Sequence, residues 1–178
     1  VIREQATESD PDRILAQAIS QAPNVVLGFF IYNNPADVAA MDTSRRKAEL
    51  AGVEGSQIGV IKPWDAVEAE AYPFKLRKGL ALRGPLPILA EATPYFGHVS
   101  FDQDHDGTIR WGNLLGEVDN PDDPQTRLIF PSLALKAAAR HLDREVVIHT
   151  YPKGVSKVSL GLGNTAFDIP TNYLGRLM

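Results

Sequence analysis

The chain has 178 residues, of which 44% are hydrophobic and none is cysteine, and its formal net charge is −4. This length and apolar content suffice for one domain with a hydrophobic core, and the chain is too short for two comfortable domains. The scattered charges exclude the concentrated positive surface that nucleic acid needs, and the lack of cysteine excludes disulfides and thiolate metal sites.

A first helix is predicted from Asp10, a helix-capping residue, and Pro11, which suits the first helical position. The residues that share one face of it are Ile14, Leu15, Ala18, Ile19 and Ala22, and Pro23 ends it. The apolar run VVLGFFIY at 25–32 follows. It predicts a strand that is covered on both faces.

Residues 33–79 give the weakest pattern, with an alanine-rich helical stretch over 38–50, and we interpret them as a peripheral elaboration. The basic run 45–47 within them is expected to lie on a solvated helix face. After residue 79 the sequence predicts a brief strand and a short helix around 86–93, and this segment ends at Gly97.

A helix over 131–142 is predicted to pack on a sheet and to be covered almost all round. Its apolar residues leave only a narrow polar stripe of Ser132, Lys136, Arg140 and Asp143. Strands are predicted over 145–149, 153–160 and 166–169. The fold class that follows is α/β, with a mixed sheet that contains a central antiparallel hairpin and is packed by helices.

The stretch FDQDHDG at 101–107 resembles the start of an EF-hand calcium loop. That loop ends in a glutamate that supplies two oxygens, and here the corresponding residue is Asn113. The flanking segments alternate like strands, whereas an EF-hand needs helices. Calcium binding through Asp102, Asp104 and Asp106 is therefore the less favoured interpretation.

The favoured interpretation is a β-hairpin with the three-residue loop His105, Asp106 and Gly107, in which the glycine is left-handed. In this register Phe101 faces Trp111 in the core. Asp102 faces Arg110 on the wetter side, and His98 lies on the same polar face.

Motifs for catalysis are weak. GLGNTA at 161–166 matches a dinucleotide fingerprint, but no helix can follow it, so we interpret it as a glycine turn between two strands. The four histidines show no metal-ligand spacing, and the chain has no nucleophile elbow. A hydrolase whose site is assembled from distant residues remains an alternative, and we expect no cofactor.

Several segments, in this order, resemble one family: DPDRILAQAISQA leading into NVVLGF, then LPILAEATPYFGHVSFDQDHDGTIRW, PSLALKAAA and IPTNYLGRL. They are similar to the CHASE group of extracytoplasmic sensory domains of bacterial cyclases and histidine kinases, and within it to the second subtype. The likeness covers most of 10–177 and is poor over 33–79. Its most specific element is the D-x-D-G-x-x-R turn of Asp104, Asp106, Gly107 and Arg110.

The resemblance implies one non-enzymatic extracytoplasmic sensor domain over 1–178, anchored by flanking transmembrane helices. Its cytoplasmic output domain would be an adenylate or guanylate cyclase, a histidine kinase or a Ser/Thr kinase. Family members begin with a membrane helix and an acidic, serine-containing strand segment before the helix that starts here near Asp10. We therefore expect the N-terminal part of the family domain to be missing, and an exposed sheet edge to favour a homodimer.

The expected signal is an unknown small molecule or protein, and the expected contact residues are His98, Asp102, Asp104 and Arg110. A salt-bridged turn without a ligand is the structural alternative for these residues. The alternative function is a calcium-stabilised structural or adhesion module that uses the aspartates of the 102–106 cluster.

Overall fold

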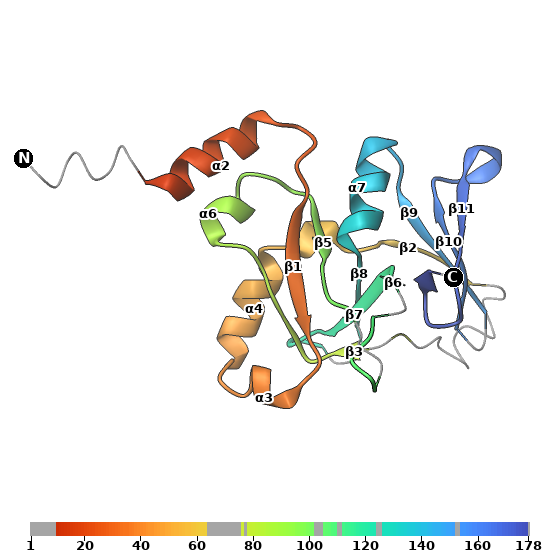
Figure 1. Cartoon of the computed structure of the whole chain (residues 1–178), viewed down its shortest axis with the longest axis horizontal. Helices are drawn as coiled ribbons and strands as arrows, with labels where there is room; N and C mark the ends of the chain where they lie inside the picture. Colours follow the sequence, from red (N-terminus) through yellow and green to blue (C-terminus); the bar gives the residue numbers. More distant parts are fainter. Residues whose placement is uncertain are drawn as a thin grey trace, which may run out of the picture.

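Helices and strands interleave along the chain in a computed structural model that describes residues 10–63, 76, 78–101, 105–109, 112–123, 126–151 and 154–177 (Figure 1). The helices are α2 (Pro11–Gln21), α3 (Pro35–Val38), α4 (Thr43–Ala51), α6 (Pro87–Ala90) and α7 (Leu133–His141), with short 3-10 turns η1 (Glu54–Ser56) and η2 (Gly163–Thr165). The strands are β1 (Leu27–Tyr32), β2 (Val60–Pro63), β3 (Lys78–Gly79), β4 (Ala81–Arg83), β5 (Phe96–His98), β6 (Gly112–Asn113), β7 (Leu115–Asp119), β8 (Arg127–Pro131), β9 (Val146–Tyr151), β10 (Gly154–Leu160), β11 (Phe167–Pro170) and β12 (Arg176–Leu177).

The strands form small sheets of mixed direction. One sheet has the order β4-β1-β5, a second β3-β7-β8 and a third β11-β10-β9-β2, while β12 pairs with β6. Strand β1 runs parallel to β5 and antiparallel to β4, and a parallel bridge between His98 and Ser132 links the first sheet to the end of β8. The predicted mixed α/β class is confirmed.

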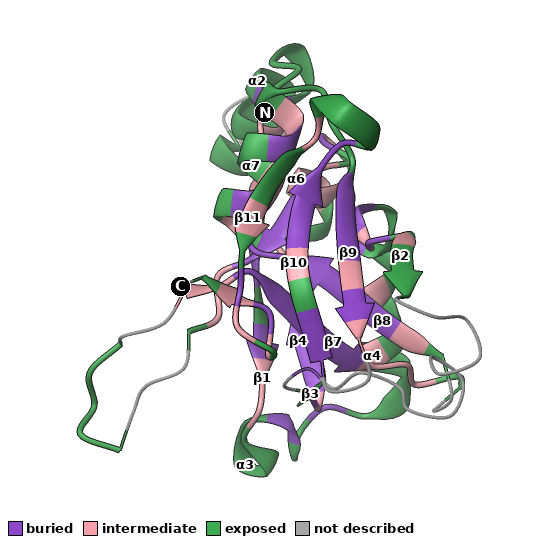
Figure 2. Ribbon diagram, turned by 90° about the vertical axis from the view of Figure 1, so that its right-hand side faces the viewer, coloured by how far each residue is buried: buried purple, intermediate pink, exposed green. Residues whose placement is uncertain are grey.

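Helix α2 begins where the sequence predicts. The Asp10 side chain accepts a hydrogen bond from the backbone N–H of Asp12 at 3.1 Å, and α2 packs against α6. Only Ile19 is buried on this helix, whereas Ile14 is 58% exposed and Leu15 49% exposed. Figure 2 shows α2 as mostly exposed, in contrast to the largely buried β9 and β10.

The prediction that the first strand is covered on both faces is wrong. Phe29 and Ile31 of β1 are buried, but Phe30 between them is 55% exposed. Side chains alternate along a strand, so one face of β1 packs in the core and the other faces outward. A continuous apolar run therefore did not indicate a doubly covered strand here.

Helix α7 packs against β5, β8 and β9, as its apolar sequence predicts, but it is not covered all round. Ser132 caps the helix by accepting a hydrogen bond from the backbone N–H of Leu135 at 3.3 Å. Leu135 and Ala139 are buried, whereas Ala134, Ala137 and Ala138 are exposed. Exposed alanine adds little apolar surface and favours helix, so an alanine-rich helix can be buried on one side only.

The segment 33–79 is not peripheral where the structure describes it. Val53 is completely buried among residues of β1, β4, β5, β7 and β8. Strand β2 pairs in parallel with β9, Val60 lying opposite Val147. Sequence patterns missed this role because the strand is only four residues long and its partner lies far away in the chain.

The C-terminal strands agree with the prediction. Strands β9, β10 and β11 form consecutive antiparallel pairs, and Gly161 and Gly163 adopt positive φ values of 88° and 71° between β10 and β11. The GLGNTA motif is thus a glycine turn between strands. Within the described residues, no helix combines the length and apolarity needed to cross a membrane.

Candidate functional site

The predicted hairpin around the aspartates is wrong in its described part. Strand β5 ends at His98, and residues 99–101 and 105–109 belong to no strand. Phe101 is 60% exposed and Ile109 51% exposed, so neither is a core residue. Trp111, the expected partner of Phe101, lies outside the described residues.

The tight turn itself is present. His105 and Asp106 lie in a turn, and Gly107 has the expected left-handed conformation with a φ of 80°. The Asp106 carboxylate accepts a hydrogen bond from the backbone N–H of Thr108 at 3.0 Å. Asp102, Asp104 and Arg110 lie outside the described residues, so ligand contact or calcium binding by this cluster stays a prediction.

His98 does not lie on a polar face. It is only 3% exposed, and its ring meets the ring of Phe29 edge-on, with centroids 6.5 Å apart. Its strand is flanked by β1 on one side and by the start of α7 on the other, through the bridge to Ser132. His98 is thus a core residue at the meeting point of two sheets, which corrects its predicted position on the polar face of a hairpin.

A cavity of about 380 Å³ lies where the β4-β1-β5 and β11-β10-β9-β2 sheets approach each other, and we name it the junction cavity. It is lined by residues 56–60, which lead from η1 into β2, by Tyr95 before β5, by Pro131, by Lys136, Ala139 and Arg140 of α7, and by residues 143–146 between α7 and β9. Figure 1 shows α7 between β5 and β9. The volume is in the range of small-molecule sites.

The cationic side of the junction cavity is built on one turn of α7. Lys136 and Arg140 are four residues apart and therefore share a helix face. The Lys136 Nζ lies 5.9 Å and the Arg140 Cζ 4.6 Å from the centroid of the Tyr95 ring. Both cations thus gather at one aromatic side chain.

Arg140 is held in place by several acceptors. Its Nε and Nη2 both donate to the backbone oxygen of Pro23 at 3.3 Å, and its Nη1 lies 3.5 Å from the carboxylate of Asp143. The two hydrogen bonds to Pro23 tie α7 to the loop that leads from α2 to β1. The guanidinium is therefore positioned before any ligand arrives.

Lys136 is less well compensated. Burial lowers the pKa of its ammonium group, because the charged form loses hydration there. Among the described residues, no carboxylate forms an ion pair with it. A half-buried cation without a counter-ion is a natural position for an anionic group of a ligand.

The part of the lining formed by residues 58–60 is apolar and rich in backbone. Ile58 is buried and Val60 is half-buried, and a Cβ added to the exposed Gly59 between them would meet no atom within 4 Å. Two hydrogen bonds hold this segment in place. The backbone N–H of Ile58 donates to the backbone oxygen of Ile129 at 2.8 Å, and the side-chain amide of Gln57 donates to the backbone oxygen of Arg127 at 3.3 Å. The cavity therefore has one charged wall and one apolar wall.

A separate polar cluster, which we name the Ser159 cluster, lies on the β11-β10-β9-β2 sheet. The Ser159 hydroxyl lies 2.9 Å from the His149 Nε2 and donates to the Asp168 carboxylate at 2.7 Å. Lys157 donates to the other oxygen of Asp168 at 2.6 Å. Hydrogen bonds from Lys157 and Ser159 lower the pKa of Asp168, while burial and the nearby Lys157 charge lower the pKa of His149.

Serine, histidine and aspartate are the residue types of a hydrolase triad, but here the hydrogen bonds connect them in a different order. In a triad the histidine lies between the serine and the carboxylate and removes the serine proton. Here the serine lies in the middle, its single proton goes to Asp168, and the residue is 1% exposed. The His149 ring then donates its Nε2–H to Ser159, so the cluster is a polar network that joins three strands.

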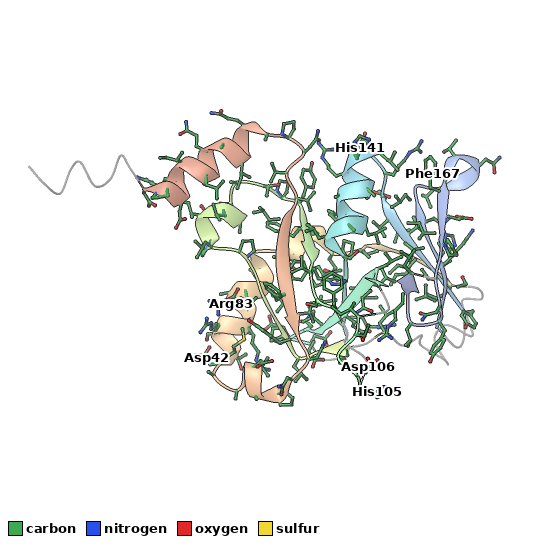
Figure 3. All side chains as sticks on the ribbon, viewed as in Figure 1. Asp42, Arg83, His105, Asp106, His141 and Phe167 are labelled. Atoms are coloured by element: carbon green, nitrogen blue, oxygen red, sulfur yellow. The ribbon has the colours of Figure 1, made fainter. Side chains whose placement is uncertain are left out.

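Sequence patterns did not identify the junction cavity. Lys136 and Arg140 were recognised only as part of a polar stripe on an apolar helix, and Tyr95 only as part of a helix exit. The four-residue spacing of Lys136 and Arg140 was the available signal, but it did not show which distant segments face these two side chains. Figure 3 shows His105 and Asp106 near the lower edge and His141, at the end of α7, near the upper edge. The predicted turn and this helix are thus far apart.

Comparison with known proteins agrees with the resemblance found in the sequence. Neither the curated proteins nor the solved structures compared with this chain gave a match. A family model described as CHASE2 domain matches residues 1–178, the whole length given. The chain therefore belongs to the CHASE2 family of extracellular sensory domains.

Proposed function

We propose that this domain is the ligand-sensing input module of a membrane-bound bacterial receptor whose cytoplasmic output is a cyclase or a protein kinase. In this proposal the domain lies outside the cytoplasmic membrane, and flanking transmembrane helices in the parent chain carry the signal inward. The signal is an external molecule that binds in the junction cavity.

The observation that carries the proposal is the position of the junction cavity. Tyr95 and Ser56, which lie at the start of β5, connect it to the β4-β1-β5 sheet, while Val60 of β2 and residues 143–146, which lead into β9, connect it to the β11-β10-β9-β2 sheet. A ligand that contacts both walls changes the relative stability of two placements of these sheets. Such a ligand shifts the receptor's output only by the difference in its affinity for the two placements.

The test is to fill the junction cavity in the membrane-bound receptor that carries this domain. Gly59 lines the cavity, and an added side chain meets no atom within 4 Å of the Cβ position. We expect Gly59→Leu to change basal cyclase or kinase output and to abolish the response to the signal. Gly55→Leu is the matched control, because Gly55 has equally open surroundings and does not line the cavity.

The measurement is output activity in isolated membranes, together with thermal melting of both variant domains. If both variants melt like the parent protein and give the same output as it does, the junction cavity is not the input site. If Gly55→Leu alters output as much as Gly59→Leu, the effect is general to the loop and the proposal fails.

A further inference from the structure

We propose that the ligand of the junction cavity is a small organic acid, whose carboxylate lies against Lys136 and Arg140 and whose apolar part lies against Ile58, Val60 and Val146. This inference rests on the proposed function and specifies the chemistry of the signal. It follows from the distribution of charge and apolar surface over the two walls.

The cationic wall favours an anion. Two like charges at positions i and i+4 of a helix repel each other, and here they also converge on one ring. Arg140 is partly compensated by Asp143 and by the backbone oxygen of Pro23, whereas Lys136 has no ion-pair partner among the described residues. A carboxylate between the two cations removes the repulsion and makes charge-assisted hydrogen bonds.

The same wall disfavours a cationic ligand. The Tyr95 ring, the aromatic group of the cavity, already has two cations over it. The two acidic lining residues offer no buried position for a positive charge, because the Asp143 side chain is 94% exposed and Glu145 is exposed as well. An amine in this cavity would meet Lys136 and Arg140 without compensation.

The size and the second wall indicate an organic ligand rather than an inorganic ion. The cavity holds about 380 Å³, far more than one oxyanion fills. Ile58 and Val146 are buried members of the hydrophobic core, and Val60 is half-buried beside them. Covering their remaining surface with the apolar part of an acid adds affinity that inorganic phosphate cannot supply.

The experiment is an NMR titration of the ¹⁵N-labelled 178-residue chain with benzoate, benzamide, benzylammonium and inorganic phosphate. These organic probes have nearly the same size and differ in charge. We expect saturable shifts of the amides of 56–60 and 136–146 with benzoate. The affinity for benzamide should be lower by a factor of roughly ten or more, because a neutral amide lacks the charge-assisted hydrogen bonds. Benzylammonium should not bind there.

Variants then connect the binding to the cationic wall. Lys136→Met keeps the approximate length of the side chain and removes the charge. The affinity for benzoate should therefore fall by a factor of roughly ten or more. Lys136→Arg should restore most of the affinity. Lys62→Met is the matched control, since Lys62 is exposed and lines the cavity beside the Ser159 cluster instead.

Each other outcome overturns the inference. Equal binding of benzamide and benzoate, or unchanged benzoate binding by Lys136→Met, shows that charge does not select the ligand. Phosphate that binds as tightly as benzoate shows a bare oxyanion site, and no shifts with benzoate at millimolar concentrations show that acids are not the ligand class. If Gly59→Leu still alters receptor output, the proposed function survives and only the ligand class is wrong.

Discussion

The backbone N–H of Phe96 donates a 2.6 Å hydrogen bond to the hydroxyl of Ser56, which in turn donates to the backbone oxygen of Pro94 at 3.1 Å. Ser56 is completely buried, so this side chain completes the hydrogen bonding at the start of β5 from a segment 40 residues earlier. The contact fixes η1 to the edge of the junction cavity.

Ser56→Ala should destabilise the domain by about 1 to 3 kcal/mol, because the Phe96 N–H would remain buried without its acceptor. Urea unfolding of the purified chain measures the change. Ser20→Ala is the control, since Ser20 is exposed and its hydroxyl donates to the backbone oxygen of Gln17 within α2. Equal stability of the two variants would show that the buried hydroxyl is dispensable.

Gly97 allows α7 to approach β5 closely. A Cβ on Gly97 would lie 2.5 Å from the Leu133 Cα and 2.6 Å from the Leu133 nitrogen, and backbone atoms cannot move aside as a side chain can. We expect Gly97→Ala to lower the free energy of unfolding by roughly 1 to 3 kcal/mol through overpacking.

The matched control is Gly55→Ala, where the added methyl group meets nothing within 4 Å. Thermal melts of both variants measure the change, and Gly55→Ala should leave the stability of the domain close to that of the parent protein. A Gly97→Ala protein as stable as the control would mean that α7 shifts freely on the sheet, contrary to the packing described here.

Arg127 and Glu117 form a two-pronged ion pair across the β7–β8 hairpin, with distances of 3.1 Å and 2.5 Å. The Glu117 side chain is 9% exposed and the Arg127 side chain 27% exposed. Arg127→Met should lower the free energy of unfolding by about 2 to 3 kcal/mol. This is near the lower limit for breaking a buried ion pair, because the arginine is partly hydrated.

The double variant Glu117→Leu with Arg127→Met should recover much of that loss, since no unpaired charge then stays buried. Arg45→Met is the control, because Arg45 is 49% exposed and lies 3.8 Å from Glu49. Its effect should stay within about 0.5 kcal/mol. A double variant less stable than Arg127→Met alone would contradict this account.

The Ser159 cluster should make stability depend on pH. The folded pKa of His149 is lowered from its usual 6.5, so the unfolded chain binds the proton more readily and stability falls as the pH drops below about 6.5. The pKa of Asp168 is lowered from 3.8, so its contribution is present above that value and is lost in more acidic solution.

Denaturant unfolding between pH 8 and pH 5 covers the range in which His149 contributes, and comparison with a His149 variant isolates that contribution. His149→Gln should flatten the curve over this range, whereas His105→Gln, an exposed residue of the turn at 105–107, should leave its slope unchanged. If His149→Gln retains the full slope, another group titrates there.

The elements that the sequence predicted correctly are those with local signals. Strands β9, β10 and β11 follow one another along the chain, with a glycine turn between β10 and β11, and α2 has both a capping aspartate and a proline at its start. Each of these features is determined by neighbouring residues, so the sequence alone identifies it.

The incorrect predictions concern pairing between distant segments. The hairpin prediction assumed that β5 had a free side for residues 109–111. In the structure β1 occupies one side of β5, and the bridge from His98 to Ser132 occupies the other. The junction cavity was missed for the same reason, since Tyr95, Lys136 and residues 56–60 meet only through the sheet order.

The parallel pairing of β2 with β9 has a consequence for how the chain is made. Strand β2 cannot be paired until β9 has left the ribosome, and α7 and β8 are synthesised in between. Such non-local pairing slows folding and leaves an unpaired edge exposed during synthesis. Because Val60 of β2 and Val146 of β9 both line the junction cavity, the cavity is complete only after these two strands have paired.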